Sequence, residues 1–194
     1  MQLYDFEHRP EMEKMEHKVN HLMLSPNGKR FMVIHRWLKG GKKYSRLLTC
    51  DINGKNLYNL SDDDMVSHCF WKNDNEIIAY CRKGKTDGYY LMKDNSRDFD
   101  RKWDFLTVDG HPSYSPDKKY VVTDTYPDKN RVSTIRILGD KTCIEIARVK
   151  SPFKYDNDTR CDLHPRWDRK GEQICFDGVF EGKRNLYVVK VRPL

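Results

Sequence analysis

The sequence lacks any apolar run approaching the roughly 18 residues that a membrane-spanning helix needs. Its N-terminus, MQLYDFEHRPEMEKMEH, has no apolar segment of the kind found in a secretory signal. The mean hydropathy is −0.87, as in water-soluble globular chains. We therefore expect a cytoplasmic protein that does not interact with membranes.

The short motifs of several large enzyme classes are also missing. The chain contains no GxSxG, no Walker loop, no GxGxxG and no CxxC. These absences exclude a nucleophile-elbow serine hydrolase, a P-loop phosphotransferase and a Rossmann dehydrogenase as interpretations of this sequence. Any chemistry must come from residues brought together by another arrangement.

Cysteine is present but follows no disulfide or zinc pattern. Several of the six cysteines lie inside apolar strand-like runs such as IIAYC and QICF. We interpret them as small buried thiols, which agrees with a reducing compartment. The six are Cys50, Cys69, Cys81, Cys143, Cys161 and Cys175.

Positive charge is in excess, with a net charge of +7 over 194 residues and an isoelectric point near 9.0. Such a field favours anionic partners. Lysine and arginine alternate with acidic residues, however, and no basic block is interleaved with exposed aromatic residues. We expect an acidic oligosaccharide or an acidic protein as partner, and no nucleic acid.

A repeat runs through the chain. Each copy has a histidine, two variable residues, a bulky apolar residue, a polar turn and an apolar strand, and copies start 47, 43 and 53 residues apart. This period is typical of β-propeller blades. The copies are HLMLSPNGKRFMVIH from His21, HCFWKNDNEIIAYCR from His68, HPSYSPDKKYVVTDT from His111 and HPRWDRKGEQICFDG from His164.

The segments between these copies supply further strands, among them SRLLTCDI, GYYLMK, STIRIL and NLYVVKV. We predict an all-β protein with about four propeller blades, at residues 19–64, 65–108, 109–160 and 161–194. Residues 1–18 form an N-terminal segment in which LYDF is expected to be the outer strand of a preceding blade. Four blades are the lower limit for closure, so the chain is expected to be part of a seven- or eight-bladed ring or to self-associate.

Four of the seven histidines occupy one repeat position: His21, His68, His111 and His164. The first strand of a blade is innermost, so these imidazoles are expected at one mouth of the central channel. Imidazole suits both transition metals and general base work near neutral pH. The alternative is a structural histidine of the type found in WD repeats, bonded to a local partner such as Ser25, Ser115 or Asp168.

Further polar residues are expected near the same rim. Asp124 and Asp177 end the strands that follow the third and fourth turns. Arg36, Arg160 and Arg166 are the candidate substrate-binding residues, because a guanidinium matches a carboxylate through two parallel hydrogen bonds. Salt bridges to neighbouring aspartates are the alternative for these arginines.

The SPNGK and SPDKK turns resemble the TolB-type propeller repeat. The strings SHCFWKNDNEIIAY, DGHPSYSPDKKYVVTDTYPD and RCDLHPRWDRKGEQICFD resemble the C-terminal half of the oligogalacturonate-lyase-like propellers. The resemblance covers about residues 19–192. It implies a cytoplasmic enzyme that holds a divalent metal, manganese or alternatively zinc, and cleaves uronides by β-elimination. It also implies that His111 is a metal ligand, although LTVDG stands where the family has a glutamine and a further histidine.

On this basis we expect His68, His111 and His164 to hold the metal, with His21 and His68 as candidate catalytic bases. Two alternatives stay open. One is a propeller that binds an acidic glycan or protein without chemistry, and the other is an interaction scaffold with a structural histidine ring.

Overall fold

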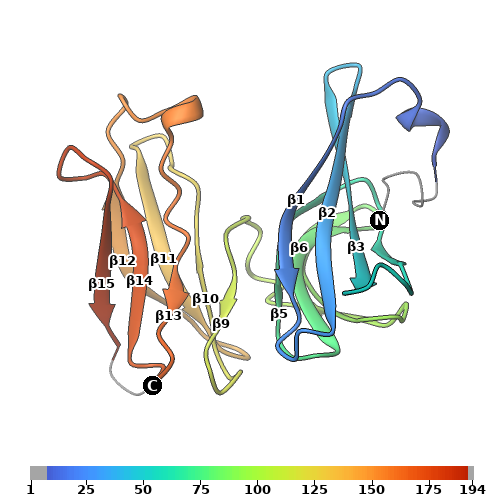
Figure 1. Cartoon of the computed structure of the whole chain (residues 1–194). Helices are drawn as coiled ribbons and strands as arrows, with labels where there is room; N and C mark the ends of the chain where they lie inside the picture. Colours follow the sequence, from blue (N-terminus) through green and yellow to red (C-terminus); the bar gives the residue numbers. More distant parts are fainter. Residues whose placement is uncertain (1–7, 192–194) are drawn as a thin grey trace. The chain divides into compact units, whose positions relative to one another are not determined.

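The computed structural model describes residues 8–191, which form β-sheets with two short 3-10 helices, η2 (Pro10–Met12) and η3 (Asn157–Thr159). The chain divides into two compact units, one up to Asp104 and one from Phe105 onward (Figure 1). Each unit is described by itself. The LYDF strand expected before the first blade lies outside the described residues.

Unit 1 contains two antiparallel four-stranded sheets. In both, strand follows strand in sequence order, as in a propeller blade. The first sheet is β1 (His17–Leu24), β2 (Arg30–Lys39), β3 (Lys42–Asp51) and β4 (Tyr58–Ser61). The second is β5 (Val66–Trp71), β6 (Glu76–Lys83), β7 (Thr86–Lys93) and β8 (Phe99–Lys102).

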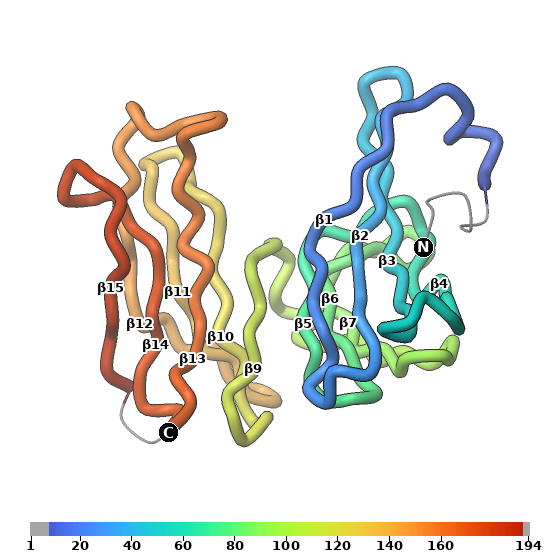
Figure 2. The backbone as a smooth tube through the Cα atoms, viewed as in Figure 1, coloured from blue at the N-terminus to red at the C-terminus, as the bar shows by residue number. Residues whose placement is uncertain are grey.

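Unit 2 contains a four-stranded and a three-stranded sheet with the same connectivity (Figure 2). The expected all-β fold with four blades is thereby confirmed. The third sheet is β9 (Ser113–Tyr114), β10 (Val121–Asp124), β11 (Val132–Leu138) and β12 (Cys143–Lys150). The fourth is β13 (Arg166–Trp167), β14 (Gln173–Gly178) and β15 (Asn185–Lys190).

The polar turn of the repeat closes the first hairpin of each of three blades. Ser25 Oγ accepts from the amide of Arg30 at 3.0 Å, and Ser115 Oγ accepts from the amide of Tyr120 at 3.0 Å. Asp168 does the same with its carboxylate in the fourth sheet. These three residues therefore bond the turns and are not the local partners of the repeat histidines.

Apolar faces of the two sheets pack together within each unit. In unit 1, Met32 and Ile34 of β2 pack in one cluster with Ile77 and Ala79 of β6. Unit 2 repeats the arrangement, with side chains of β10 and β11 against those of β14. The two sheets of each unit therefore share one core. Each large apolar side chain that is fully buried in it contributes roughly 1.5–3 kcal/mol to stability.

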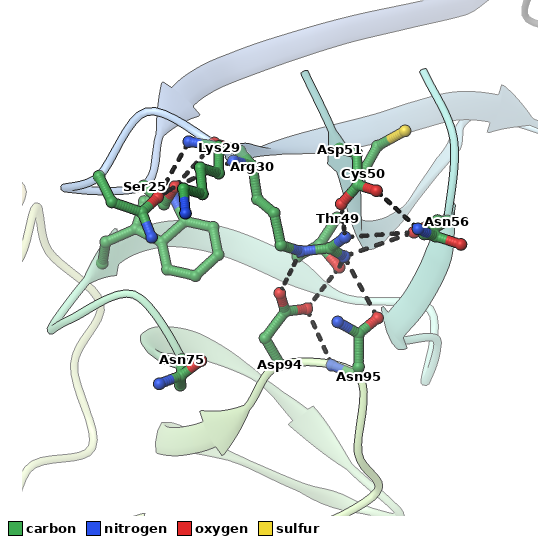
Figure 3. A network of polar contacts seen from close by, with 12 residues as sticks. Ser25, Lys29, Arg30, Thr49, Cys50, Asp51, Asn56, Asn75, Asp94 and Asn95 are labelled. Carbon is green, nitrogen blue, oxygen red and sulfur yellow. Dashed lines mark hydrogen bonds and ion pairs between the residues drawn. The ribbon is translucent and has the colours of Figure 1, made fainter. Parts of the chain in front are cut away.

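A polar network also ties the two sheets of unit 1 together (Figure 3). The guanidinium of Arg30 on β2 bonds Asp94 after β7 at 2.6 Å and also pairs with Asp51. Thr49 Oγ1 donates to the other oxygen of Asp94 at 2.6 Å. Asp94 is nearly fully buried, and its carboxylate would be costly to bury without these hydrogen-bond partners.

All six cysteines are free thiols, and four of them are buried: Cys50, Cys69, Cys81 and Cys161. The expected burial is wrong for Cys143, which is exposed, and Cys175 is half-buried. Burial raises the pKa of Cys69 to about 12 and that of Cys81 to about 11. Within residues 8–191, no helix has the length and apolar character needed to cross a membrane.

Candidate metal centre

Three side chains of unit 2 form the group of possible metal donors found among residues 8–191: His111, Asp162 and His164. Their ligand atoms all lie within 4.8 Å of one another, and all three side chains are half-buried. The two imidazole ring centroids are 4.1 Å apart. His111 precedes β9 and His164 precedes β13, and these two strands lie side by side (Figure 1).

A glycine allows the loop before β9 to approach the neighbouring strand. A Cβ atom on Gly110 would lie 1.9 Å from the backbone oxygen of Asp124 and 2.7 Å from Thr123 Oγ1. No side chain fits there, because the nearest obstacle is backbone. Gly110 thus lets His111 sit directly against the end of β10.

The buried carboxylate of Asp124 organises both histidine segments. It accepts from the amide of His111 at 2.7 Å, from the amide of His164 at 3.1 Å and from His111 Nδ1 at 2.9 Å. Burial alone would raise the pKa of Asp124, but these hydrogen bonds outweigh it and hold the pKa below its ordinary value. Asp124 is therefore ionised and fixes two loops from different blades.

The hydrogen bonds also assign the imidazole tautomers. A carboxylate only accepts, so His111 Nδ1 carries a proton toward Asp124. His164 Nδ1 lies 3.1 Å from the backbone oxygen of Asp162, which likewise only accepts. In the neutral form of each ring, Nε2 is then the nitrogen that carries the lone pair, as in metal sites whose imidazoles are oriented by an outer carboxylate or carbonyl.

His164 has two further properties of a functional residue. Its φ of 44° lies in the left-handed region, which is uncommon for residues with a side chain. Burial and then the neighbouring His111 lower the pKa of His164, which favours the neutral, ligating form. Asp177, noted in the sequence as a rim residue, has a carboxylate oxygen 3.8 Å from His164 Nδ1.

Arg160 and Tyr126 flank the donor group. Arg160 bonds both oxygens of Asp162, at 2.8 and 2.9 Å, and its guanidinium carbon lies 4.8 Å from the Tyr126 ring centroid. The Tyr126 ring in turn lies 5.9 Å from that of His111, edge to face. Burial and the carboxylates of Asp109 and Asp162 raise the pKa of Tyr126 to about 12, so its hydroxyl is a donor at neutral pH.

The donor set fits a divalent transition metal. Two imidazoles and one carboxylate suit manganese and zinc alike, and three protein ligands leave positions open for a substrate oxygen. His111 and His164, two of the three predicted ligands, belong to this group, whereas the third, His68, belongs to unit 1; the predicted metal binding stays a prediction. Asp162 was not predicted as a ligand, although it stands only two residues before His164 in the sequence.

The other two repeat histidines form a pair in unit 1. The rings of His21 and His68 are 5.2 Å apart, edge to face, and His68 Nδ1 lies 3.1 Å from Ser67 Oγ. His21 is also in the left-handed region, with a φ of 54°. The four histidines are thus grouped as two pairs, one within each unit, and the catalytic roles of His21 and His68 stay predictions.

Two of the predicted substrate-binding arginines contact backbone oxygens. Arg36 Nη2 donates to the carbonyl of Ser67 at 2.9 Å, beside the pair in unit 1. Arg166 is exposed, and its Nη1 donates to the carbonyl of His164 at 2.6 Å. Arg160 is the one of the three that forms a salt bridge with a carboxylate of the donor group.

No protein-family model and no curated protein matches the sequence. Solved structures do match the fold. An oligogalacturonate lyase from Vibrio parahaemolyticus has a TM-score of 0.66 and 14% identity, over 90% of this chain and 49% of that one. TolB from Acinetobacter baumannii has a TM-score of 0.58 and 14% identity, over 87% and 53%.

An oligogalacturonate lyase in complex with manganese also matches, with a TM-score of 0.53 and 11% identity, over 88% of this chain and 64% of that chain. This chain therefore spans between about half and two thirds of the length of these three propellers. At such identities the likeness concerns the fold. The chain has the β-propeller fold shared by TolB and the oligogalacturonate lyases.

Proposed function

We propose that the chain takes part in metal-assisted β-elimination on uronic acid oligosaccharides, with His111, Asp162 and His164 as the residues that hold a divalent metal. The observation that carries this proposal is the single carboxylate of Asp124 that fixes the segments of both histidines and the tautomer of one. Manganese is the favoured ion, because one structural neighbour is an oligogalacturonate lyase in complex with manganese.

The bound metal would supply a Lewis acid that withdraws charge from the uronate carboxylate and acidifies the adjacent C–H. The residues of this chain do the remaining work. A base takes the proton on C5, the C–H electron pair forms the C4–C5 double bond, and the C4–O bond breaks with its pair on the departing oxygen. Tyr126, protonated at neutral pH, is suited to hydrogen-bond an anionic oxygen near His111.

His21 and His68 are the proposed bases, because each is an imidazole at the repeat position of the metal-binding pair. Arg36, Arg160 and Arg166 are proposed to bind carboxylates of the oligosaccharide. Completion of the ring by a second copy of this chain is part of the proposal. It is supported by the exposed Leu186 and Val188 on β15.

A binding module for acidic glycans or proteins is the second candidate. It is favoured by the Arg160 salt bridge, which already engages both oxygens of Asp162, the one carboxylate of the donor group. Digestion of trigalacturonate with manganese present separates the two candidates. The enzyme yields unsaturated uronides that absorb in the ultraviolet, and the matched His111→Asn variant does not. A chain that binds trigalacturonate without forming this product is a binding module.

A further inference from the structure

The Arg160 guanidinium occupies both oxygens of a side chain that the candidate metal centre needs. Its Nε and Nη2 atoms lie 2.8 and 2.9 Å from the two carboxylate oxygens of Asp162. Asp162 is the one anionic member of the three-donor group, and its side chain is 15% exposed. The charge that would attract a cation is therefore already neutralised by an arginine.

The main chain at Arg160 is held firmly, whereas its side chain is 40% exposed. The amide of Arg160 donates to Asn157, which closes η3, and its carbonyl accepts from Arg184 Nη2 at 3.0 Å. A capping box between Asp156 and Thr159 fixes the start of the same turn. Movement in this region is consequently expected in the Arg160 side chain and not in the loop.

The aromatic ring of Tyr126 provides a second contact for the guanidinium. Arg160 Cζ lies 4.8 Å from the Tyr126 ring centroid, and Tyr126 lies beside His111. A guanidinium can keep stacking on an aromatic face while its hydrogen-bonding edge changes partner. Arg160 can thus leave Asp162 and stay at the rim of the donor group.

We propose that Arg160 is an internal counter-ion that competes with the divalent metal for Asp162 and binds the carboxylate of an anionic sugar once the metal has displaced it. The inference rests on the metal site of the proposed function. The cation and the guanidinium are both positively charged, so they repel each other while each is attracted to the carboxylate of Asp162. Displacement frees a planar pair of N–H donors that matches a uronate carboxylate.

This exchange couples the two ligands. Metal raises the affinity for the uronate because Arg160 no longer has to be separated from Asp162. By thermodynamic reciprocity, the uronate raises the affinity for the metal by the same factor. An arginine that merely orients Asp162 would instead help the metal to bind and would contribute nothing to anion affinity.

Calorimetric titration with Mn²⁺ and with digalacturonate tests the exchange on the purified chain. Arg160→Met removes the counter-ion. Arg136→Met is the matched control, since Arg136 is in the same unit and pairs with Glu145, which is not a member of the donor group. Arg160→Lys keeps the charge but loses the planar pair of donors, and it serves if the methionine variant does not fold.

We expect Arg160→Met to bind Mn²⁺ about tenfold more tightly than the wild type and Arg136→Met to bind it unchanged. In saturating Mn²⁺, Arg160→Met and Arg160→Lys should bind digalacturonate about tenfold more weakly. Wild-type affinity for digalacturonate should rise with Mn²⁺, and that rise should be absent in Arg160→Met. Binding of Mn²⁺ by Arg160→Met but not by the wild type also supports the exchange.

Unchanged or weaker Mn²⁺ binding by Arg160→Met would overturn the exchange and leave the metal site standing. Failure of both proteins to bind Mn²⁺ at millimolar concentration would overturn the exchange and the metal site together. If the expected affinities are found but trigalacturonate yields no unsaturated product, only the β-elimination proposal fails.

Discussion

Asp124 Oδ1 lies 2.9 Å from His111 Nδ1, and the same buried carboxylate accepts the amide of His164 through its other oxygen. One ionised group thus connects segments from two blades that are 53 residues apart in the sequence. A purely structural histidine needs one local partner. Here the partner also fixes the backbone of the segment that carries a second imidazole, which favours a metal-binding role for the pair.

Replacement of Asp124 should weaken metal binding while the protein remains folded. In Asp124→Asn, one amide oxygen must serve three donors, and the new NH₂ group faces an N–H. We expect the affinity for Mn²⁺ to fall about 10- to 100-fold, as for other outer-sphere carboxylates. Calorimetry measures this fall, with circular dichroism to verify the fold. Wild-type affinity in this variant would contradict the positioning role of Asp124.

Gly110→Ala should destabilise unit 2, because the new Cβ would overlap the carbonyl of Asp124. We expect a loss of about 1–3 kcal/mol in the free energy of unfolding, together with weaker Mn²⁺ binding. Gly88→Ala is the matched control, since its Cβ would lie 3.4 Å from the flexible Arg101 side chain. Equal urea midpoints for the two variants would show that the close approach at Gly110 is not required.

Arg30→Met should destabilise unit 1. The variant leaves the buried Asp94 with Thr49 and the amide of Asn95 as its partners. We expect a loss of about 3 kcal/mol, the usual result of removing one member of a buried ion pair. Thermal or urea unfolding measures it, with the more exposed Arg136→Met as control. The double variant Arg30→Met/Asp94→Leu should recover part of the loss, and no recovery would argue against an unpaired charge as the cause.

The stability of the described fold should fall in mild acid because of His35. Its Nε2 lies 2.9 Å from His17 Nδ1, and its Nδ1 accepts from Arg46 Nε at 3.2 Å. Burial, then the charges of Arg46 and His17, lower the pKa of His35 to about 4, against a smaller opposite effect of Asp62.

The depressed pKa means that the unfolded state binds the proton more tightly. The neutral His35 therefore contributes its full stability above about pH 6.5, and this contribution is lost as the pH falls toward 4. Between pH 7.5 and 5 we expect the wild type to lose about 2 kcal/mol more than His35→Gln in urea unfolding. Parallel losses in the two proteins would show that His35 does not titrate in this way.

The repeat made the sheets predictable, because a histidine, a bulky residue and a polar turn recur at blade spacing. In each copy an apolar strand follows the turn. The same repeat made His111 and His164 candidate ligands, together with His68. The salt bridge of Arg160 with Asp162 is local, but the grouping of Asp162 with His111 and the contact of Arg160 with Tyr126 depend on packing between two blades, which no local pattern encodes. Asp124 was recognisable as a strand-end rim residue, but its burial beneath two histidine segments depends on the close approach at Gly110.

The most direct test of the metal centre is the manganese stoichiometry of the purified chain, measured by elemental analysis after incubation with excess Mn²⁺ and gel filtration. His111→Asn/His164→Asn is the comparison variant, because asparagine tolerates the left-handed backbone of His164. We predict about one manganese ion per wild-type chain and a loss of nearly all of it in the variant. Equal manganese contents in the two proteins, or none in either, would contradict the site.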